Sequence, residues 1–281
     1  MINGGFDDLP IVATGIDPKT TTLWVVISDK ASQSIDVYRE MIRQEVGDVP
    51  TKVGFGEFSR TACSSRTSNC DPIKGGIRVQ AYDNNQGFDT YGTMAIYVKR
   101  TTGTEGFLIS GHHTGWGFTG DDVGQASDSR QVGIVTVNPS GGATKTRTSD
   151  AAFVDLDNGI SINQNKIYKT STTEYTVVSK TNPPDPGSAR LHTFHGTLDG
   201  WILGYNWTVY DPGTGETTTG QVAVDAVTQG GDSGGPVTSI PSGSNNVDFY
   251  GVIVGNVTID DYTFSVFSPW QSIKSELSLQ N

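Results

Sequence analysis

The octapeptide Gln229-Gly-Gly-Asp-Ser-Gly-Gly-Pro236 is the most informative stretch of this 281-residue chain. Its glycines allow dihedral angles and close approaches that other residues do not, so the segment predicts a tight turn from which Ser233 projects. In such a turn the amides of Gly231 and Ser233 point into a small cavity and form an oxyanion hole. The alternative, a glycine-rich turn between strands, is weaker because a string this long rarely arises by chance. We predict a nucleophilic serine at position 233.

A serine hydroxyl needs a neighbouring base, and the chain offers four histidines for that role. His112 ends the segment Gly-Phe-Leu-Ile-Ser-Gly-His (106–112), where an apolar strand would place its last side chain at the edge of a cleft. His113 is the immediate alternative, while His192 and His195 lie in another predicted strand region. We predict His112 as the general base.

The base in turn needs an orienting carboxylate. Asp150 precedes Ala-Ala-Phe-Val (151–154), so it enters the predicted interior at the end of an apolar strand. A carboxylate buried there requires a partner, which an imidazole N–H supplies. Asp155 and Asp157 fit exposed positions at the other end of that strand, and the alternative for Asp150 is an ordinary turn residue. We predict Asp150 as the partner of His112.

Beyond Pro72 the chain consists of short apolar or alternating runs that turn clusters separate. Many strands at this spacing predict an antiparallel barrel or sandwich rather than parallel strand-helix units. One convincing helix follows, within residues 268–280 near the end of the chain. The predicted strands occupy residues 73–82, 93–100, 105–111, 131–138, 151–157, 175–180, 201–210 and 249–257.

The first 60 residues have a different pattern. Residues 21–28 predict a buried strand and residues 50–58 a second one. Between them we expect a helix with Ser28 or Asp29 as its N-cap and Gly47 at its end. Its apolar face is expected to carry Ile35, Tyr38, Met41, Ile42 and Val46. We predict a small α/β unit over residues 1–60.

Two cysteines lie in the polar stretch that follows, over residues 61–72. Cys63 and Cys70 are separated by six residues, where a short loop disulfide is geometrically plausible. Two free thiols are the alternative, because disulfides follow oxidising compartments. Two sulfurs alone make a poor zinc site, and we predict neither a metal nor a cofactor.

The overall charge excludes some functions. Nineteen lysines and arginines face 30 aspartates and glutamates, a formal net charge of −11, which argues against a nucleic-acid partner. No window approaches the roughly 18 consecutive apolar residues of a membrane span. The opening MINGGFDDLP lacks the regions of a signal peptide. We expect a secreted protein whose signal peptide was removed before this numbering begins.

The order His112, Asp150, Ser233 is that of chymotrypsin-like enzymes and differs from the subtilisin and α/β-hydrolase orders. Over residues 73–281 the chain resembles the bacterial chymotrypsin-fold peptidases of the streptogrisin and alpha-lytic protease type. The motifs that carry this resemblance are IKGG, FLISGHH, SDAAFV, FHGTLDGWILGYNWTVY, VTQGGDSGGPV and YGVIVGN.

The resemblance implies a mainly β fold of two six-stranded antiparallel barrels with a C-terminal helix and the triad in the cleft between the barrels. Residues 1–60 look like the propeptide of this group, which assists folding and docks on the peptidase domain (73–281) until processed, with 61–72 as a cysteine-containing linker. A permanent docked domain is the alternative. The implied substrate pocket comprises Val227, Thr228, Gln229, Val254, Gly255 and Asn256. Val227 near its base disfavours a basic substrate side chain, and an apolar or small one is expected.

Three departures from the family pattern stand out. His113 occupies the place of a cysteine, and no cysteine follows Cys70, so the usual disulfides are absent. Val254 occupies the place of a serine that bonds the catalytic aspartate. A new N-terminus at Ile73 paired to Asp232 requires cleavage after Pro72, which we do not expect, and the basic partner of Asp232 is left open.

The resulting hypothesis is a secreted serine endopeptidase, made as a zymogen, that hydrolyses peptide or protein substrates through an acyl-enzyme. The alternative is a catalytically silent homologue that binds a peptide or protein partner through the same cleft. An esterase or lipase is disfavoured, because its triad order and strand-helix nucleophile elbow are missing.

Overall fold

A computed structural model of the chain describes residues 9–16, 21–28, 31–56, 65–83, 88–114, 118–125, 130–139, 145–211, 215–259 and 261–281. The chain divides into two compact units, Met1–Arg60 and Thr61–Asn281. Within the described ranges, no helix is both long and apolar enough to cross a membrane.

The first unit is a three-stranded sheet with one helix. The strands are β1 (Ile11–Ile16), β2 (Leu23–Ser28) and β3 (Thr51–Gly56), and the helix is α1 (Ile35–Val46). The predicted strand-helix-strand is present, with β2 and β3 parallel, and β1 adds an antiparallel neighbour to β2.

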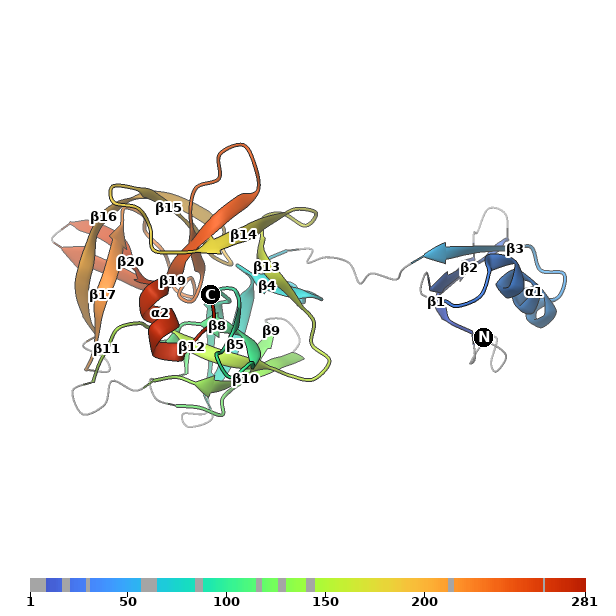
Figure 1. The fold of residues 1–281 in the computed structure, drawn as a ribbon, viewed down its shortest axis with the longest axis horizontal. Helices are drawn as coiled ribbons and strands as arrows, with labels where there is room; N and C mark the ends of the chain where they lie inside the picture. The colour runs from blue at the N-terminus through green and yellow to red at the C-terminus, as the bar shows by residue number, and fades with distance from the viewer. Residues whose placement is uncertain are drawn as a thin grey trace. The chain divides into compact units, whose positions relative to one another are not determined.

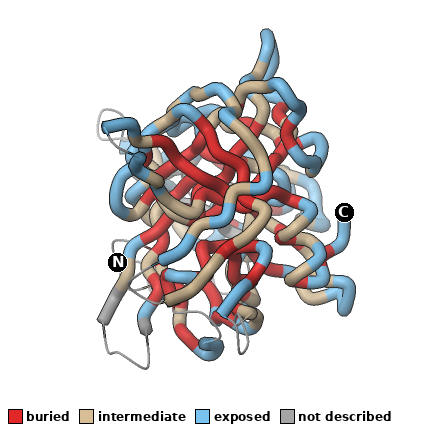
Figure 2. The backbone as a smooth tube through the Cα atoms, turned by 90° about the vertical axis from the view of Figure 1, so that its left-hand side faces the viewer, coloured by how far each residue is buried: buried red, intermediate tan, exposed pale blue. Residues whose placement is uncertain are grey.

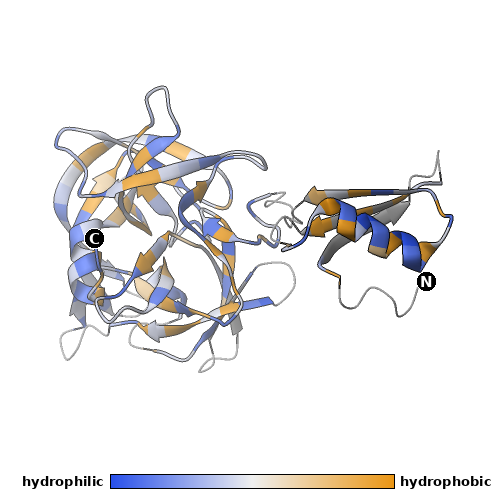
Figure 3. Cartoon of the chain, turned by 45° about the vertical axis from the view of Figure 1, so that its right-hand side comes forward, coloured by the Kyte–Doolittle hydropathy of each residue, from blue (hydrophilic) through white to orange (hydrophobic). Residues whose placement is uncertain are grey.

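Helix α1 differs from the prediction at its start. The helix begins at Ile35 with Ser34 as N-cap, rather than after Ser28 or Asp29; Asp29 lies outside the described residues. Asp36 in the first turn favours this start, because a negative charge is stabilising near a helix N-terminus. The buried face is also narrower than expected, since Tyr38 and Ile42 are buried but Met41 is exposed. Figure 3 shows hydrophobic and hydrophilic residues alternating along this helix.

The first part of the second unit is a closed antiparallel barrel. Its strands follow the order β6-β5-β9-β10-β12-β8-β7. The two ends of this order, β6 and β7, are joined directly by residues 94–96. The segment 88–99 is therefore one bent strand that pairs with β5 at its start and with β8 at its end, which closes the ring. The bounds are β5 (Arg78–Asp83), β6 (Phe88–Thr93), β7 (Tyr97–Lys99), β8 (Glu105–Ile109), β9 (Asp122–Gln125), β10 (Arg130–Val137) and β12 (Ala152–Leu156).

The second part is also a closed antiparallel ring, in which β15-β16-β17-β20-β19-β18 pair in that order and β18 returns to β15. Figure 1 shows β16 and β17 as its long hairpin. The bounds are β15 (Ser188–His192), β16 (Thr197–Asp211), β17 (Glu216–Val224), β18 (Pro236–Thr238), β19 (Asn246–Ile259) and β20 (Tyr262–Pro269). The two-barrel prediction is confirmed.

Four further strands extend the second sheet beyond the ring. The strands β14, β13 and β4 continue outward from β19, and β11 pairs with β17. Their bounds are β4 (Ile73–Gly75), β11 (Thr146–Arg147), β13 (Ile162–Tyr168) and β14 (Glu174–Lys180). Figure 2 shows burial concentrated on the strands and exposure on the connecting loops, as expected for barrels filled by side chains.

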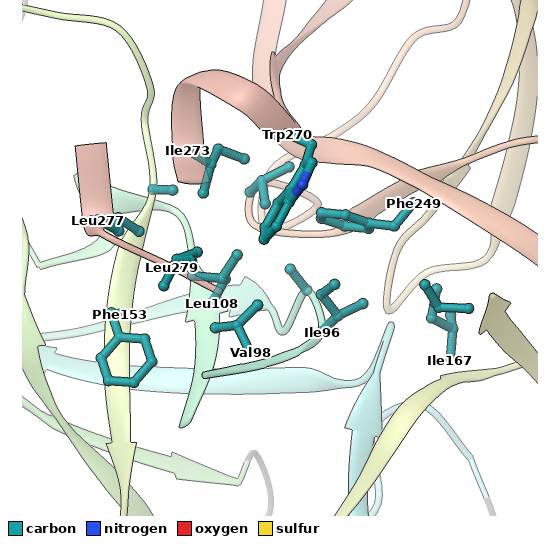
Figure 4. Close-up of a cluster of buried hydrophobic side chains, with 14 of the residues drawn as sticks. Ile96, Val98, Leu108, Phe153, Ile167, Phe249, Trp270, Ile273, Leu277 and Leu279 are labelled. Carbon is teal, nitrogen blue, oxygen red and sulfur yellow. The ribbon is translucent and has the colours of Figure 1, made fainter. Parts of the chain in front are cut away.

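The C-terminal helix α2 (Trp270–Leu277) confirms the predicted terminal helix and packs on residues from both barrels. Trp270 is completely buried in a cluster with Phe249 of the second barrel and Phe153 and Leu108 of the first (Figure 4). Glu276 on the same helix accepts hydrogen bonds from the amides of Thr148 (3.2 Å) and Ser149 (3.0 Å). The helix therefore holds the turn that leads into Asp150.

Replacing Trp270 tests the role of this cluster. We expect Trp270→Ala to lower the free energy of unfolding by about 3–5 kcal/mol, because it leaves a cavity where the helix meets both barrels. Trp270→Phe is the control and should cost less: it keeps an aromatic ring and removes an indole N–H that has no acceptor among the described residues. Chemical denaturation followed by circular dichroism measures both, and equal losses would contradict the prediction.

Candidate active site

Ser233 lies in the turn between β17 and β18, where the backbone is strongly constrained. The Asp232 amide donates to the Gln229 carbonyl (3.0 Å), and the Gly234 amide donates to the Ile253 carbonyl (2.8 Å). Gly231 has φ +90° and Gly234 has φ +87°, in the region that favours glycine. The glycines that the sequence places on either side of Ser233 are therefore required by the shape of the turn.

The same turn fits against the first barrel without free space. The Thr93 amide donates to the Ser233 carbonyl (2.9 Å), and the Thr93 hydroxyl donates to the Gly231 carbonyl (3.0 Å). A Cβ atom at Gly234 would collide with the Thr93 carbonyl and lie 3.0 Å from the Ser110 amide. This packing brings Ser233 beside Ser110, two residues before His112.

His112 and Asp150 form a direct pair at the end of β8. His112 belongs to the 3₁₀ turn Gly111–His113, and its Nδ1 lies 2.5 Å from Oδ2 of Asp150. The His112 amide also donates to Oδ1 of Asp150 (3.0 Å). The His112 side chain is 36% exposed and that of Asp150 is 1% exposed. Nδ1 is thus held by the buried carboxylate, which leaves Nε2 as the ring nitrogen available for chemistry.

Ser110 supplies a contact that the sequence interpretation missed. Its hydroxyl donates to Oδ2 of Asp150 (2.6 Å), and the Ser268 hydroxyl accepts the Asp150 amide (2.8 Å). Val254, where the family usually has a serine, takes no part in these contacts among the described residues. Ser110 lies within the FLISGHH motif, but the strand pattern alone does not show that its side chain turns toward Asp150.

The charges around this pair shift both pKa values. Desolvation favours neutral imidazole, but the charge and hydrogen bond of Asp150 outweigh it and raise the pKa of His112 above 6.5. Burial favours a protonated Asp150, yet His112, Arg147 and the Ser110 hydroxyl together hold the pKa of Asp150 below its ordinary value. Arg147 is buried and donates to the Ala151 carbonyl (2.7 Å). The pair is stabilised in its charged form.

Two of the three other histidines, His113 and His192, are buried. Burial, and then the charge of His112, lower the pKa of His113 to about 3. Its ring occupies the space where a side chain at Gly92 would stand. Burial also lowers the pKa of His192 well below 6.5, and its Nε2 lies 2.9 Å from the Thr238 hydroxyl. Neither contacts Asp150 in the described part of the chain.

The Ser233 hydroxyl is bonded to the backbone of β19 in this structure. It donates to the Val254 carbonyl (2.8 Å), and no hydrogen bond joins it to His112 among the described residues. Neither the Gly231 amide nor the Ser233 amide has an acceptor within the described segments. Rotation about one side-chain bond redirects the Ser233 hydroxyl. The two amides of the predicted oxyanion hole are meanwhile available as donors.

His195 is the basic partner of Asp232 that the sequence left unassigned. Its Nδ1 lies 2.7 Å from Oδ1 of Asp232, whose other oxygen accepts the Gln229 amide (2.9 Å). The ring of His195 packs on Phe194 with centroids 3.9 Å apart, and a Cβ atom at Gly231 would lie 2.6 Å from the Phe194 ring. His195 and Phe194 therefore brace the turn that carries Ser233.

The predicted pocket residues lie in two segments that contact each other. Thr228 and Asn256 are joined by hydrogen bonds, and Ser265 on β20 completes this group. Val227 is 55% exposed and lines a hollow of about 450 Å³ together with Thr228, Gln229 and His195. Thr228, rather than Val227, is the residue of this loop that contacts Asn256. Val254 and Gly255 precede Asn256 in β19, and the Val254 carbonyl accepts the Ser233 hydroxyl.

Residues 65–72 belong to the second unit and pack on its first barrel. Cys70 is buried and disulfide-bonded, and Cys63 lies outside the described residues. The Cys70 amide donates to Oε1 of Gln125 (3.0 Å), and Gln125 donates back to the Cys70 carbonyl (2.9 Å). The Ile73 amide donates to the Ser161 carbonyl (2.9 Å). The side chain of Asp232 is paired with His195 rather than with Ile73.

Solved structures with the same fold provide a comparison. Thermobifida fusca Protease A is 24% identical with a TM-score of 0.55, and the match covers 74% of this chain and 97% of that one. Nocardiopsis protease is 20% identical with a TM-score of 0.54, covering 75% and 100%. Alpha-lytic protease homolog N4 is 18% identical with a TM-score of 0.56, covering 74% and 97%. No protein-family model and no curated protein matches the chain.

These neighbours are bacterial chymotrypsin-like serine proteases, and the chain has their fold. The predicted resemblance in fold is confirmed. No cluster of three or more metal-ligating side chains occurs in the parts of the chain that the structure describes.

Removing the His195 side chain tests how the turn is braced. The Asp232 side chain is 2% exposed, so His195→Ala leaves a buried carboxylate oxygen without its side-chain partner. We expect the free energy of unfolding to fall by about 1–3 kcal/mol, the usual cost of an unsatisfied buried group. His195→Gln retains an N–H donor and should lose less. Equal losses in the two variants, measured by urea denaturation, would assign the effect to stacking on Phe194 instead.

Proposed function

We propose that this chain is a serine endopeptidase that uses Ser233, His112 and Asp150. The observation that carries the proposal is the buried Asp150 carboxylate bonded to Nδ1 of His112, next to a serine turn shaped by glycines. A buried carboxylate that orients an imidazole is what nucleophilic serine catalysis requires. The fold shared with bacterial serine proteases supports the same conclusion.

The proposed reaction transfers the acyl part of a peptide to Ser233 and then to water. The Ser233 oxygen forms a bond to the peptide carbonyl carbon while Nε2 of His112 takes the hydroxyl proton. The tetrahedral oxyanion collapses, the C–N bond breaks, and His112 returns its proton to the leaving amine. Water then attacks the ester with His112 again as base, which releases the acid and restores Ser233.

Stabilisation of the oxyanion is the second part of the proposal. The amides of Gly231 and Ser233 are the proposed donors, and the Thr93 hydroxyl bound to the Gly231 carbonyl orients one of the adjoining peptide groups. Asp150 meanwhile stabilises the imidazolium that forms on His112, as the raised pKa of His112 indicates. In this proposal the negative oxyanion is stabilised by the two amides, and the positive imidazolium is stabilised by Asp150.

We further propose that residues 1–60 act as a propeptide and that the protein is secreted as a zymogen. The division of the chain into units after Arg60 supports this, because processing there leaves residues 61–281 with their own hydrophobic clusters. A buried cysteine in a disulfide fits an oxidising compartment. The alternative to the whole proposal is a silent homologue that binds peptides without cleaving them.

Intact-mass analysis with a fluorophosphonate probe tests the proposed nucleophile. We expect one adduct on the wild-type chain and none on Ser233→Ala, which should also lose peptide hydrolysis by about six orders of magnitude. A variant with a specific protease site inserted after Arg60 allows the first unit to be removed after folding. If the wild type and the cut protein both stay unlabelled, the chain is a silent homologue.

The pH profile tests the pairing of His112 with Asp150. Only neutral His112 accepts a proton, and Asp150 raises the pKa of His112 above 6.5, so kcat/KM should fall with decreasing pH through a midpoint above 6.5. The measurement is kcat/KM for a peptide ester between about pH 5 and 9. A midpoint at or below 6.5 would show that the carboxylate does not stabilise the imidazolium in the free enzyme.

A further inference from the structure

The side chain of Asn256 joins the two segments that form the substrate pocket. Its Oδ1 accepts from the Thr228 amide (3.1 Å) and the Thr228 hydroxyl (2.7 Å), and its Nδ2 donates to the Thr228 carbonyl (2.6 Å). The backbone groups of Thr228 determine the orientation of the amide, because an N–H must face Oδ1 and a carbonyl must face Nδ2. One side chain thus occupies both backbone groups of the opposite segment.

Ser265 completes this bridge from the third side. It pairs directly with Asn256 across β19 and β20, and its hydroxyl lies 2.8 Å from Oδ1 of Asn256 and 3.1 Å from the Thr228 hydroxyl. Ser265 is fully buried and Thr228 nearly so, whereas Asn256 is exposed. The group therefore extends from the buried floor between the segments to their solvent-exposed edge, and we call Asn256, Thr228 and Ser265 the pocket bridge.

We propose that the pocket bridge closes the primary specificity pocket, so that the enzyme cleaves after residues with small side chains such as alanine. This inference rests on the proposed function. The Val254 carbonyl already contacts the Ser233 hydroxyl, and Asn256 is two residues further along the same strand. The resemblance implies that the substrate side chain next to the scissile bond enters between this strand and residues 227–229, and the Asn256 side chain bonds across that gap to Thr228.

The chemistry of the bridge explains why a large side chain does not displace it. Moving Asn256 aside breaks its bonds to the Thr228 amide, hydroxyl and carbonyl. The amide keeps the Ser265 hydroxyl as an acceptor (3.1 Å), but a phenyl or alkyl side chain offers the buried carbonyl no donor in return. Buried polar groups left unpaired in this way are a strong basis for rejecting a ligand. A methyl group needs no such displacement, so the bridge selects by both space and hydrogen bonding.

The test compares substrates that differ only in the residue before the scissile bond. Chromogenic tetrapeptide anilides with alanine, leucine, phenylalanine, glutamate or lysine at that position are assayed with the full chain and with the chain cut after Arg60. We expect kcat/KM for alanine to exceed that for phenylalanine by at least about tenfold in the wild type. Asn256→Gly should shift the ratio toward phenylalanine by at least about tenfold, because it removes the bridge.

Thr258→Gly is the matched control, since it adds a glycine to the same strand at another exposed position and should leave the ratio as in the wild type. Probe labelling of Ser233 in each sample separates the two proposals. Labelled wild type that prefers phenylalanine or leucine overturns the pocket proposal alone, as does an Asn256→Gly ratio equal to that of Thr258→Gly. Unlabelled wild type, full-length and cut, overturns the proposed function and this inference with it.

Discussion

A carboxylate held away from water is the constraint around which the second unit is organised. Asp150 is 1% exposed, and its side-chain oxygens accept from one distant segment, through the Ser110 hydroxyl and the His112 ring and amide, while Arg147 lies nearby. Its own amide is held by Ser268 of the second barrel. A buried charge is tolerated only when paired and hydrogen-bonded, so the two barrels must meet correctly for this residue to be stable.

The joint between the barrels also positions the serine turn. The Thr93 amide binds the Ser233 carbonyl, and Gly234 packs against Thr93 and Ser110 with no room for a side chain. Helix α2 adds a third connection, through buried Trp270 and through Glu276, which binds the turn before Asp150. The proposed catalytic residues are therefore held in place by packing and hydrogen bonds between the two barrels.

Much of the fold followed from local pattern. Alternating apolar runs predicted the barrel strands, and the spacing of Trp270, Ile273 and Leu277 predicted α2, because burial on one face imposes a period. Local pattern failed where the start of α1 depended on Ser34 rather than Ser28 or Asp29, and where Met41 fell outside the buried face. Both errors concern a small helix whose packing on β2 and β3 decides which residues are covered.

The sequence alone determined the candidate catalytic residues: a serine in a glycine turn, a histidine that ends a strand and an acid that begins one, in a diagnostic order. These signals are local, because glycine dihedrals and strand periodicity act between neighbours in the chain. Only the tertiary structure decided the partners, since Ser110 with Asp150, His195 with Asp232 and Asn256 with Thr228 are separated by 28 or more positions. Such pairs depend on how strands register across a barrel, which no local pattern encodes.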